Sequence, residues 1–113
     1  MTETTNRGAL PELTREQRME ALARAGEART ERRRALDEVR AGTLGAEESL
    51  RDPRLQSCKV FMWLRAFPGI GRSKAEAIMA AAGVAPSRRV RGLGARQREA
   101  VLAEVGARRS GRR

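Results

Sequence analysis

The feature that most constrains this fold is a pair of glycine-rich turns separated by a short alanine-rich stretch. The first is Pro68-Gly69-Ile70-Gly71-Arg72 and the second is Arg88-Arg89-Val90-Arg91-Gly92-Leu93-Gly94. Apolar residues recur with helical spacing on both sides of each turn, and no segment alternates with period two over a useful length. We therefore predict an all-α fold in which the two turns join successive helices.

Capping signals set the bounds of the predicted helices. Thr14 and Gln17 form a capping box, which predicts a helix from Arg15 to about Ala41 that ends at Gly42. One or two helical turns are expected between Leu44 and Leu50. The remaining predicted helices run from about Arg54 to Phe67, from a cap at Arg72 or Ser73 to Gly83, and from about Ala95 to Val105.

The first predicted helix is long and poor in large apolar residues. Met19 and Leu22 lie near one end, and Leu36 and Val39 lie near the other. We expect only the C-terminal half to dock, with the rest projecting into solvent. Three ion pairs at i,i+4 are possible on its surface, namely Glu20–Arg24, Arg33–Asp37 and Arg34–Glu38.

The later helices supply the predicted core. The stripe in the segment before the first turn consists of Leu55, Val60, Phe61, Leu64 and Phe67, and the helices that follow contribute Ala75, Ile78, Met79, Ala82, Val101, Leu102 and Val105. Trp63 lies off the stripe and is expected to pack against the long first helix. In the second turn Val90 and Leu93 are expected to point inward, which leaves Arg88, Arg89 and Arg91 pointing outward.

Positive charge is concentrated in the half of the chain that carries the turns. The net charge is +10; residues 1–53 hold 10 arginines and 11 acidic residues, whereas residues 54–113 hold 14 basic and 3 acidic residues. A one-sided positive field favours a polyanionic partner. Because 22 of the 24 basic residues are arginine, the side chains also suit bidentate phosphate contacts.

The first turn matches a helix-hairpin-helix pattern. Gly69 and Gly71 allow the backbone to approach a ligand closely, while Ile70 and Ile78 lock the two helices together. The free N–H groups and positive dipole end of the next helix then face an anion. Together with the arginines of the second turn, this pattern predicts a phosphate clamp.

Other site chemistries find little support in the sequence. There is no histidine, and a single cysteine, Cys58, excludes an intramolecular disulfide and a cysteine-based zinc site. No apolar run approaches the roughly 18 residues needed to span a membrane, and no export signal is recognisable. We expect a soluble cytoplasmic protein with no cofactor, no metal and no membrane partner.

At this point the motifs carry a family resemblance. The segments Val84–Val105 and Pro68–Met79, with the Leu10-Pro11-x-Leu13-Thr14 start of the long helix, resemble the actinobacterial integration host factor family. The resemblance covers roughly Ala9 to Val105 and is most specific in the second turn and in Arg96-Gln97-Arg98. The match is poorer between Ala46 and Phe67, and Met1 to Gly8 looks like an extension relative to a family that begins near Ala9.

The resemblance implies a fold and a function. It implies a long N-terminal helix packed on a compact helix-two-turns-helix domain related to a ribosomal protein, and a nucleoid-associated architectural protein that binds double-stranded DNA with little sequence specificity. The implied contacts are to phosphates and the minor groove, with bending or organisation of DNA and assistance to supercoiling or site-specific recombination. Implied partners are duplex DNA and DNA-processing enzymes such as a recombinase or topoisomerase, and the protein is expected to be a monomer in solution. Carried over by position, the DNA-binding residues are Gly69, Ile70, Gly71, Arg72, Lys74, Arg88, Arg89, Arg91 and Gly92.

The expected organisation has four parts. Residues 1–13 form a disordered leader, residues 14–42 the long charged helix, residues 43–105 the helix-two-turns-helix domain, and residues 106–113 a basic disordered tail. Two other function classes stay open. A structured-RNA-binding protein is an alternative, because the double-turn fold also serves RNA. A glycosylase or nuclease is a further alternative, but it needs catalytic groups, and only Glu76, Glu99 and Glu104 are acidic after Asp52, with none paired at ligand spacing; we therefore expect no enzyme and no catalytic residue.

Overall fold

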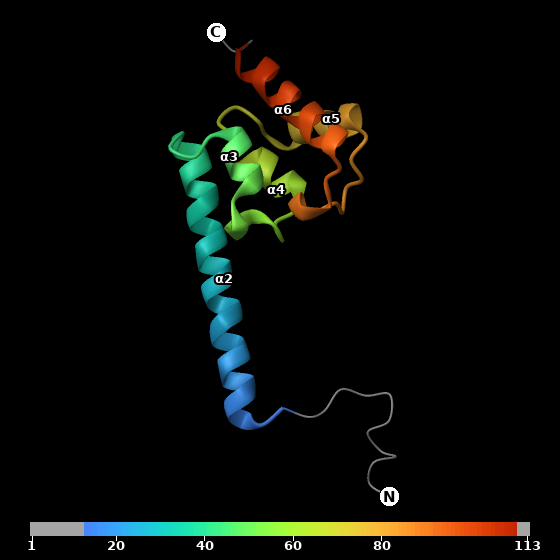
Figure 1. Cartoon of the computed structure of the whole chain (residues 1–113). Helices are drawn as coiled ribbons and strands as arrows, with labels where there is room; N and C mark the ends of the chain where they lie inside the picture. The colour runs from blue at the N-terminus through green and yellow to red at the C-terminus, as the bar shows by residue number, and fades with distance from the viewer. Residues whose placement is uncertain (1–12, 111–113) are drawn as a thin grey trace, which may run out of the picture.

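The long helix and the compact domain are both present in the computed structural model, which describes residues 13–110. Within these residues all named elements are helical, and α2 projects well beyond the cluster formed by the other helices (Figure 1). The elements in chain order are α2 (Arg15–Ala41), α3 (Ala46–Arg51), the 3-10 turn η1 (Pro53–Leu55), α4 (Val60–Arg65), α5 (Arg72–Ala82), the 3-10 turn η2 (Val90–Gly92) and α6 (Ala95–Ser110). The predicted all-α class is confirmed. The predicted leader lies outside the described residues except for Leu13.

Local signals fix both ends of α2 where they were predicted. The Gln17 N–H donates to Thr14 Oγ1 at 3.0 Å, the Thr14 N–H donates to Gln17 Oε1 at 2.8 Å, and Gly42 ends the helix. Met19 and Leu22 are 62% and 67% exposed, whereas Val39 is buried. The prediction that α2 docks only through its C-terminal half is confirmed. Helix continuity in the projecting half therefore rests on capping and intrinsic propensity.

A three-residue ion network attaches α2 to the domain. Arg54 Nη2 lies 2.8 Å from Glu38 Oε1 and 2.8 Å from Asp52 Oδ2. Hydrogen bonds from the Arg54 guanidinium hold the pKa of both carboxyls below their usual values. The predicted pair between Arg34 and Glu38 is wrong, because Glu38 instead bonds the domain.

Neighbouring charges on α2 form other pairs than those predicted. Arg34 Nη1 lies 2.9 Å from Glu31 Oε2, and Arg40 Nη1 lies 3.1 Å from Asp37 Oδ1, both at i,i+3. Asp37 is thus paired with Arg40 and not with the predicted Arg33. These pairs are exposed, so each adds only a few tenths of a kcal/mol.

The segment predicted as one helix from Arg54 to Phe67 is broken in the structure. It begins in η1, continues as an irregular connection and becomes helical only in α4. The carbonyls of Gln56 and Cys58 accept hydrogen bonds from Arg91 and Val90 at 3.0 and 2.9 Å. Backbone groups paired with a distant segment cannot also form a helical ladder, which is why the continuous helix prediction is wrong.

The domain core centres on Trp63. Its ring is fully buried, its Nε1–H donates to Ser49 Oγ at 2.7 Å, and it meets the Phe67 ring edge-on with centroids 5.0 Å apart. These contacts tie Trp63 to α3 and to Phe67 within a core that also contains Ala35 and Val39 of α2, and direct packing of Trp63 against the long helix stays a prediction. The buried hydroxyl of Ser49 in turn donates to the Ala46 carbonyl at 2.7 Å, so both the indole N–H and this hydroxyl are paired.

The last helix is longer than predicted. It continues to Ser110, so the prediction of a disordered tail is wrong for residues 106–110, and residues 111–113 lie outside the described part. Val101 and Val105 are buried and anchor the helix, and Arg108 Nη2 lies 3.6 Å from Glu104 Oε1. Glycine inside a helix costs only about 1 kcal/mol, so Gly106 does not end it.

Candidate nucleic-acid interface

The first glycine turn leaves the start of α5 open to a ligand. Gly69 has φ 85°, in the left-handed region, and Ile70 turns back into the core with 4% exposure. Gly71 is the N-cap of α5 and makes no side-chain cap hydrogen bond, so the prediction that Arg72 or Ser73 is the cap is corrected. Within residues 13–110 Gly71 thus provides no side-chain acceptor for the first-turn N–H groups of α5, which lie at the positive end of the helix dipole.

Two cations flank this helix start. Arg72 Nε lies 3.5 Å from Glu76 Oε2, with both side chains largely exposed at 79% and 61%. Exposed pairs of this kind contribute little, so a phosphate can replace Glu76 as the partner of Arg72 at small cost. Lys74 is also exposed. The first turn thus offers backbone donors and two accessible cations within one helical turn.

The second turn is held by backbone pairing with the segment before α4. The Val60 N–H donates to the Arg88 carbonyl at 3.0 Å, and the Val90 N–H donates to the Cys58 carbonyl at 2.9 Å. These bonds bracket an isolated antiparallel bridge between Lys59 and Arg89. In this non-hydrogen-bonded type of pair the two side chains leave the same face close together.

The three arginines of the second turn have different environments. The Arg91 side chain is exposed and has no hydrogen-bond or ion-pair partner among the described residues, whereas its backbone N–H donates to the Gln56 carbonyl. Arg89 is exposed, and its Nη1 donates to the Ser57 carbonyl. Arg88 is half-buried, and its Nη1 donates to the Gly92 carbonyl at 2.8 Å. The prediction that these side chains point outward holds for Arg89 and Arg91, whereas Arg88 folds over its own turn.

Gly92 has a packing role in that arrangement. A Cβ at this position would lie 3.0 Å from Arg88 Cδ. The absence of a side chain at Gly92 therefore gives Arg88 room to reach the Gly92 carbonyl. Val90 and Leu93 are buried on the other side of the turn, as predicted.

Two further cationic residues near the second turn were not predicted from the sequence as part of the site. Lys59 stands opposite Arg89 in the bridge, and Arg32 of α2 lies with its Nη1 3.4 Å from Ser57 Oγ. Burial raises the pKa of the Cys58 thiol, and the positive charges of Arg32 and Arg89 partly offset that rise. No sequence pattern indicated a site role for Lys59, because its segment has helical periodicity. Arg32 could not be distinguished from the other arginines of α2.

The chemistry of this surface is that of a binding site for anions. The first turn offers backbone N–H donors beside Arg72, and the second turn offers the exposed guanidinium groups of Arg89 and Arg91 with Lys59 opposite Arg89. Across residues 13–110 there is no cluster of three His, Cys, Asp or Glu side chains that could hold a metal ion. None of the helices in the same range combines the length and apolar character needed to cross a membrane.

Comparison with known proteins identifies the family. A family model described as the S13-like H2TH domain matches residues 43–105, which is more than half of the chain. A curated integration host factor of Mycobacterium tuberculosis is 42% identical over 102 residues, with 87% of this chain and 97% of that protein covered. This chain belongs to the integration host factor family.

Other members of the integration host factor family agree with this assignment. The integration host factor of Streptomyces coelicolor is 36% identical over 102 residues, covering 87% of this chain and 95% of that protein. A solved structure of sIHF bound to an 8-bp palindromic DNA matches with a TM-score of 0.70 and 31% identity, covering 74% of this chain and 99% of that chain. The fold class and the family predicted from the two turns are therefore confirmed.

Proposed function

We propose that this chain is an architectural protein that binds double-stranded DNA with little sequence specificity. The observation that carries the proposal is the pairing of two donor sets on one small domain: the uncapped amides at the start of α5 and the exposed guanidinium group of Arg91. A structural relative bound to duplex DNA supports the choice of polyanion. Because phosphates are the same in every duplex, contacts of this kind give affinity without sequence information.

The proposed contacts fall into two groups. The amides of Gly71 and of the first turn of α5 bind a phosphate oxygen, with Arg72 and Lys74 alongside, while Gly69 and Ile70 shape the turn. Arg91 and Arg89 reach toward phosphates and the edge of the minor groove. Arg88 and Gly92 support the second turn, and residues 43–105 together carry the DNA contacts while residues 14–42 form the charged helix.

The wider role follows from binding without sequence selection. We propose that the protein bends or organises DNA in the nucleoid and assists supercoiling or site-specific recombination, with a recombinase or topoisomerase as functional partners. It acts as a monomer in solution and as a binding protein without catalytic activity. Glu76, the carboxylate beside the first turn, supports the absence of catalysis because it is exposed and bonded to Arg72.

The test is the salt dependence of binding to unrelated duplexes. Five to seven phosphate contacts predict a slope of log K against log salt of about −4 to −6. A slope shallower than about −2 would exclude the two-turn phosphate clamp. Competition with structured ribosomal RNA fragments separates the DNA function from the RNA alternative, because preferential displacement by RNA would favour the latter.

Two further measurements examine the wider role. End-labelled duplexes of unrelated sequence report bending through a change in end-to-end energy transfer, and an unchanged distance at saturation would contradict a bending role. A nicking assay on supercoiled plasmid examines catalysis, and any protein-dependent nicking would contradict a purely architectural function.

A further inference from the structure

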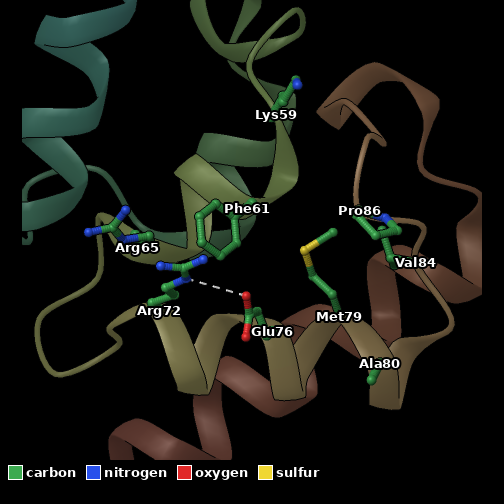
Figure 2. Close-up of a pocket in the computed structure, with 9 residues that line it drawn as sticks. All are labelled: Lys59, Phe61, Arg65, Arg72, Glu76, Met79, Ala80, Val84 and Pro86. Atoms are coloured by element: carbon green, nitrogen blue, oxygen red, sulfur yellow. Dashed lines mark ion pairs between the residues drawn. The ribbon is translucent and has the colours of Figure 1, made fainter.

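An apolar groove lies between α4, α5 and the connection that follows α5. It has a volume of about 610 Å³, within the range of about 300–1,000 Å³ typical of binding pockets. Phe61 lines it from α4, Met79 from α5, and Val84 and Pro86 from the connection. Figure 2 shows the Met79 side chain extending from α5 into the space between Phe61 and Pro86. The lining does not include Gly69, Gly71 or Gly92 of the two turns, but it shares Lys59 and Arg72 with the anion-binding surface described above.

The floor of the groove suits an apolar side chain. Met79 and Val84 are only 5% and 6% exposed, so they form a recessed surface beneath the rim. Phe61 is half-buried: it packs against the core, as expected, and its remaining surface lines the groove. Methionine adapts its unbranched side chain to differently shaped ligands, which makes Met79 a suitable contact for an inserted group.

The rim of the groove is mostly cationic. Arg65 is held over the Phe61 ring, with its Cζ 5.5 Å from the ring centroid, and Lys59 and Arg72 complete the positive rim. Among the described residues that line the groove, Glu76 is the one carboxylate, and it is already bonded to Arg72. An occupant that fits both surfaces must combine negative charge with an apolar group.

We propose that this groove binds an acidic segment of a partner protein, which inserts one apolar side chain between Phe61 and Met79 and places flanking carboxylates on Lys59 and Arg65. Duplex DNA supplies the negative charge but presents phosphates on its outside, with no apolar side chain to cover the recessed floor. The inference goes beyond DNA binding, because it gives the protein a second partner class. Through this groove a DNA-bound copy recruits a protein partner.

The probe is a pair of short synthetic peptides of aspartate and glutamate that differ at one central position. One peptide carries leucine there and the other serine, so their charges are equal. Protein labelled with ¹³C at the methionine methyls gives up to four signals, because the chain has four methionines. Met79 reports on the groove, whereas Met62 on α4 and Met19 on α2 are exposed outside its lining.

The expected result is a shift of the Met79 signal with the leucine peptide. Burial of one leucine predicts about tenfold tighter binding than the serine peptide shows. Equal binding of the two peptides, or shifts confined to Met19 and Met62, overturns the proposal. A Met79 shift with a short DNA duplex as large as that with the leucine peptide also overturns it, because the groove would then belong to the DNA interface.

Filling the groove provides an independent test. Ala80 lines the groove and is exposed, so Ala80→Leu should fold normally and weaken the leucine peptide about tenfold. Ala77→Leu is the matched control, because Ala77 is exposed on the same helix but outside the lining. If both variants bind the peptide like the wild type, the proposal fails.

A rim variant and a DNA measurement complete the design. Arg65→Glu removes a rim cation that is not among the proposed DNA contacts, and it should weaken both peptides severalfold; unchanged binding of both would contradict the assigned rim contact. Affinity for duplex DNA is measured for Ala80→Leu in parallel and should be unchanged. If the wild-type protein binds duplex DNA but does not bind the leucine peptide, this inference is refuted and the proposed function is not affected.

Discussion

Replacement of Arg91 by alanine isolates one phosphate contact from the stability of the fold. The side chain is exposed and has no partner among the described residues, so Arg91→Ala should leave the unfolding midpoint in urea unchanged. If its guanidinium group neutralises one phosphate, the slope of log K against log salt becomes less steep by about 0.9. The affinity ratio of wild type to variant should then be about 15 at 50 mM salt, about 8 at 100 mM and about 4 at 200 mM.

Fluorescence anisotropy with two labelled duplexes of unrelated sequence measures these ratios. Arg51→Ala is the charge-matched control, because Arg51 is an exposed arginine on α3 that lies 3.1 Å from Glu47 and is not a proposed contact. The control should lose less than about twofold at 100 mM salt. A ratio for Arg91 that stays constant across salt, or that differs strongly between the two duplexes, would refute the phosphate assignment and indicate base contact or altered structure instead.

Three other changes examine the turns and the supports beneath them. Gly71→Ala introduces a Cβ into open space at negative φ, so the free energy of unfolding should be unchanged while DNA affinity falls. Gly69→Ala, at φ 85°, should instead lower the free energy of unfolding in urea by about 1–2 kcal/mol, and equal stability of the two variants would contradict the assigned geometry. Ser49→Ala leaves the buried indole N–H of Trp63 without its acceptor and should lower the free energy of unfolding by about 1–3 kcal/mol. The same substitution should cost much less in a Trp63→Phe background, and an equal cost in both backgrounds would exclude this hydrogen bond as the cause. Arg54 lowers the pKa of Glu38 and of Asp52 below their usual values, so the stability from this network is present above those usual values and is lost as the pH falls through the depressed pKa values. Arg54→Met should therefore reduce the pH dependence of the urea unfolding midpoint between about pH 5 and pH 2, and a pH dependence equal to that of the wild type would contradict the network.

Local signals in the sequence predicted the long helix closely. Thr14, Gln17 and Gly42 act on backbone groups within a few residues of themselves, so no knowledge of the rest of the fold was needed. The same holds for the turn at Gly69 and for the burial of Ile70 and Ile78, because glycine conformation and helical spacing are short-range properties.

Predictions that depended on distant partners were less successful. The segment from Arg54 to Phe67 has helical periodicity, but its early carbonyls bond the second turn, and periodicity carries no information about that pairing. Glu38 was expected to bond Arg34 on its own helix and instead bonds Arg54. The side of the turn on which Arg88 lies was likewise decided by the open position at Gly92.

The sequence by itself determined the all-α class, the extent of α2, the two glycine turns and the concentration of positive charge in the second half of the chain. Each of these follows from composition, from spacing or from bonds between near neighbours. Only the tertiary structure decided which cations meet at the second turn, because Lys59 and Arg32 reach Arg89 and Ser57 through backbone pairing and helix docking across long stretches of chain. It also decided that Phe61 lines a groove, since exposure depends on which helices cover a residue and not on the periodicity of its own segment.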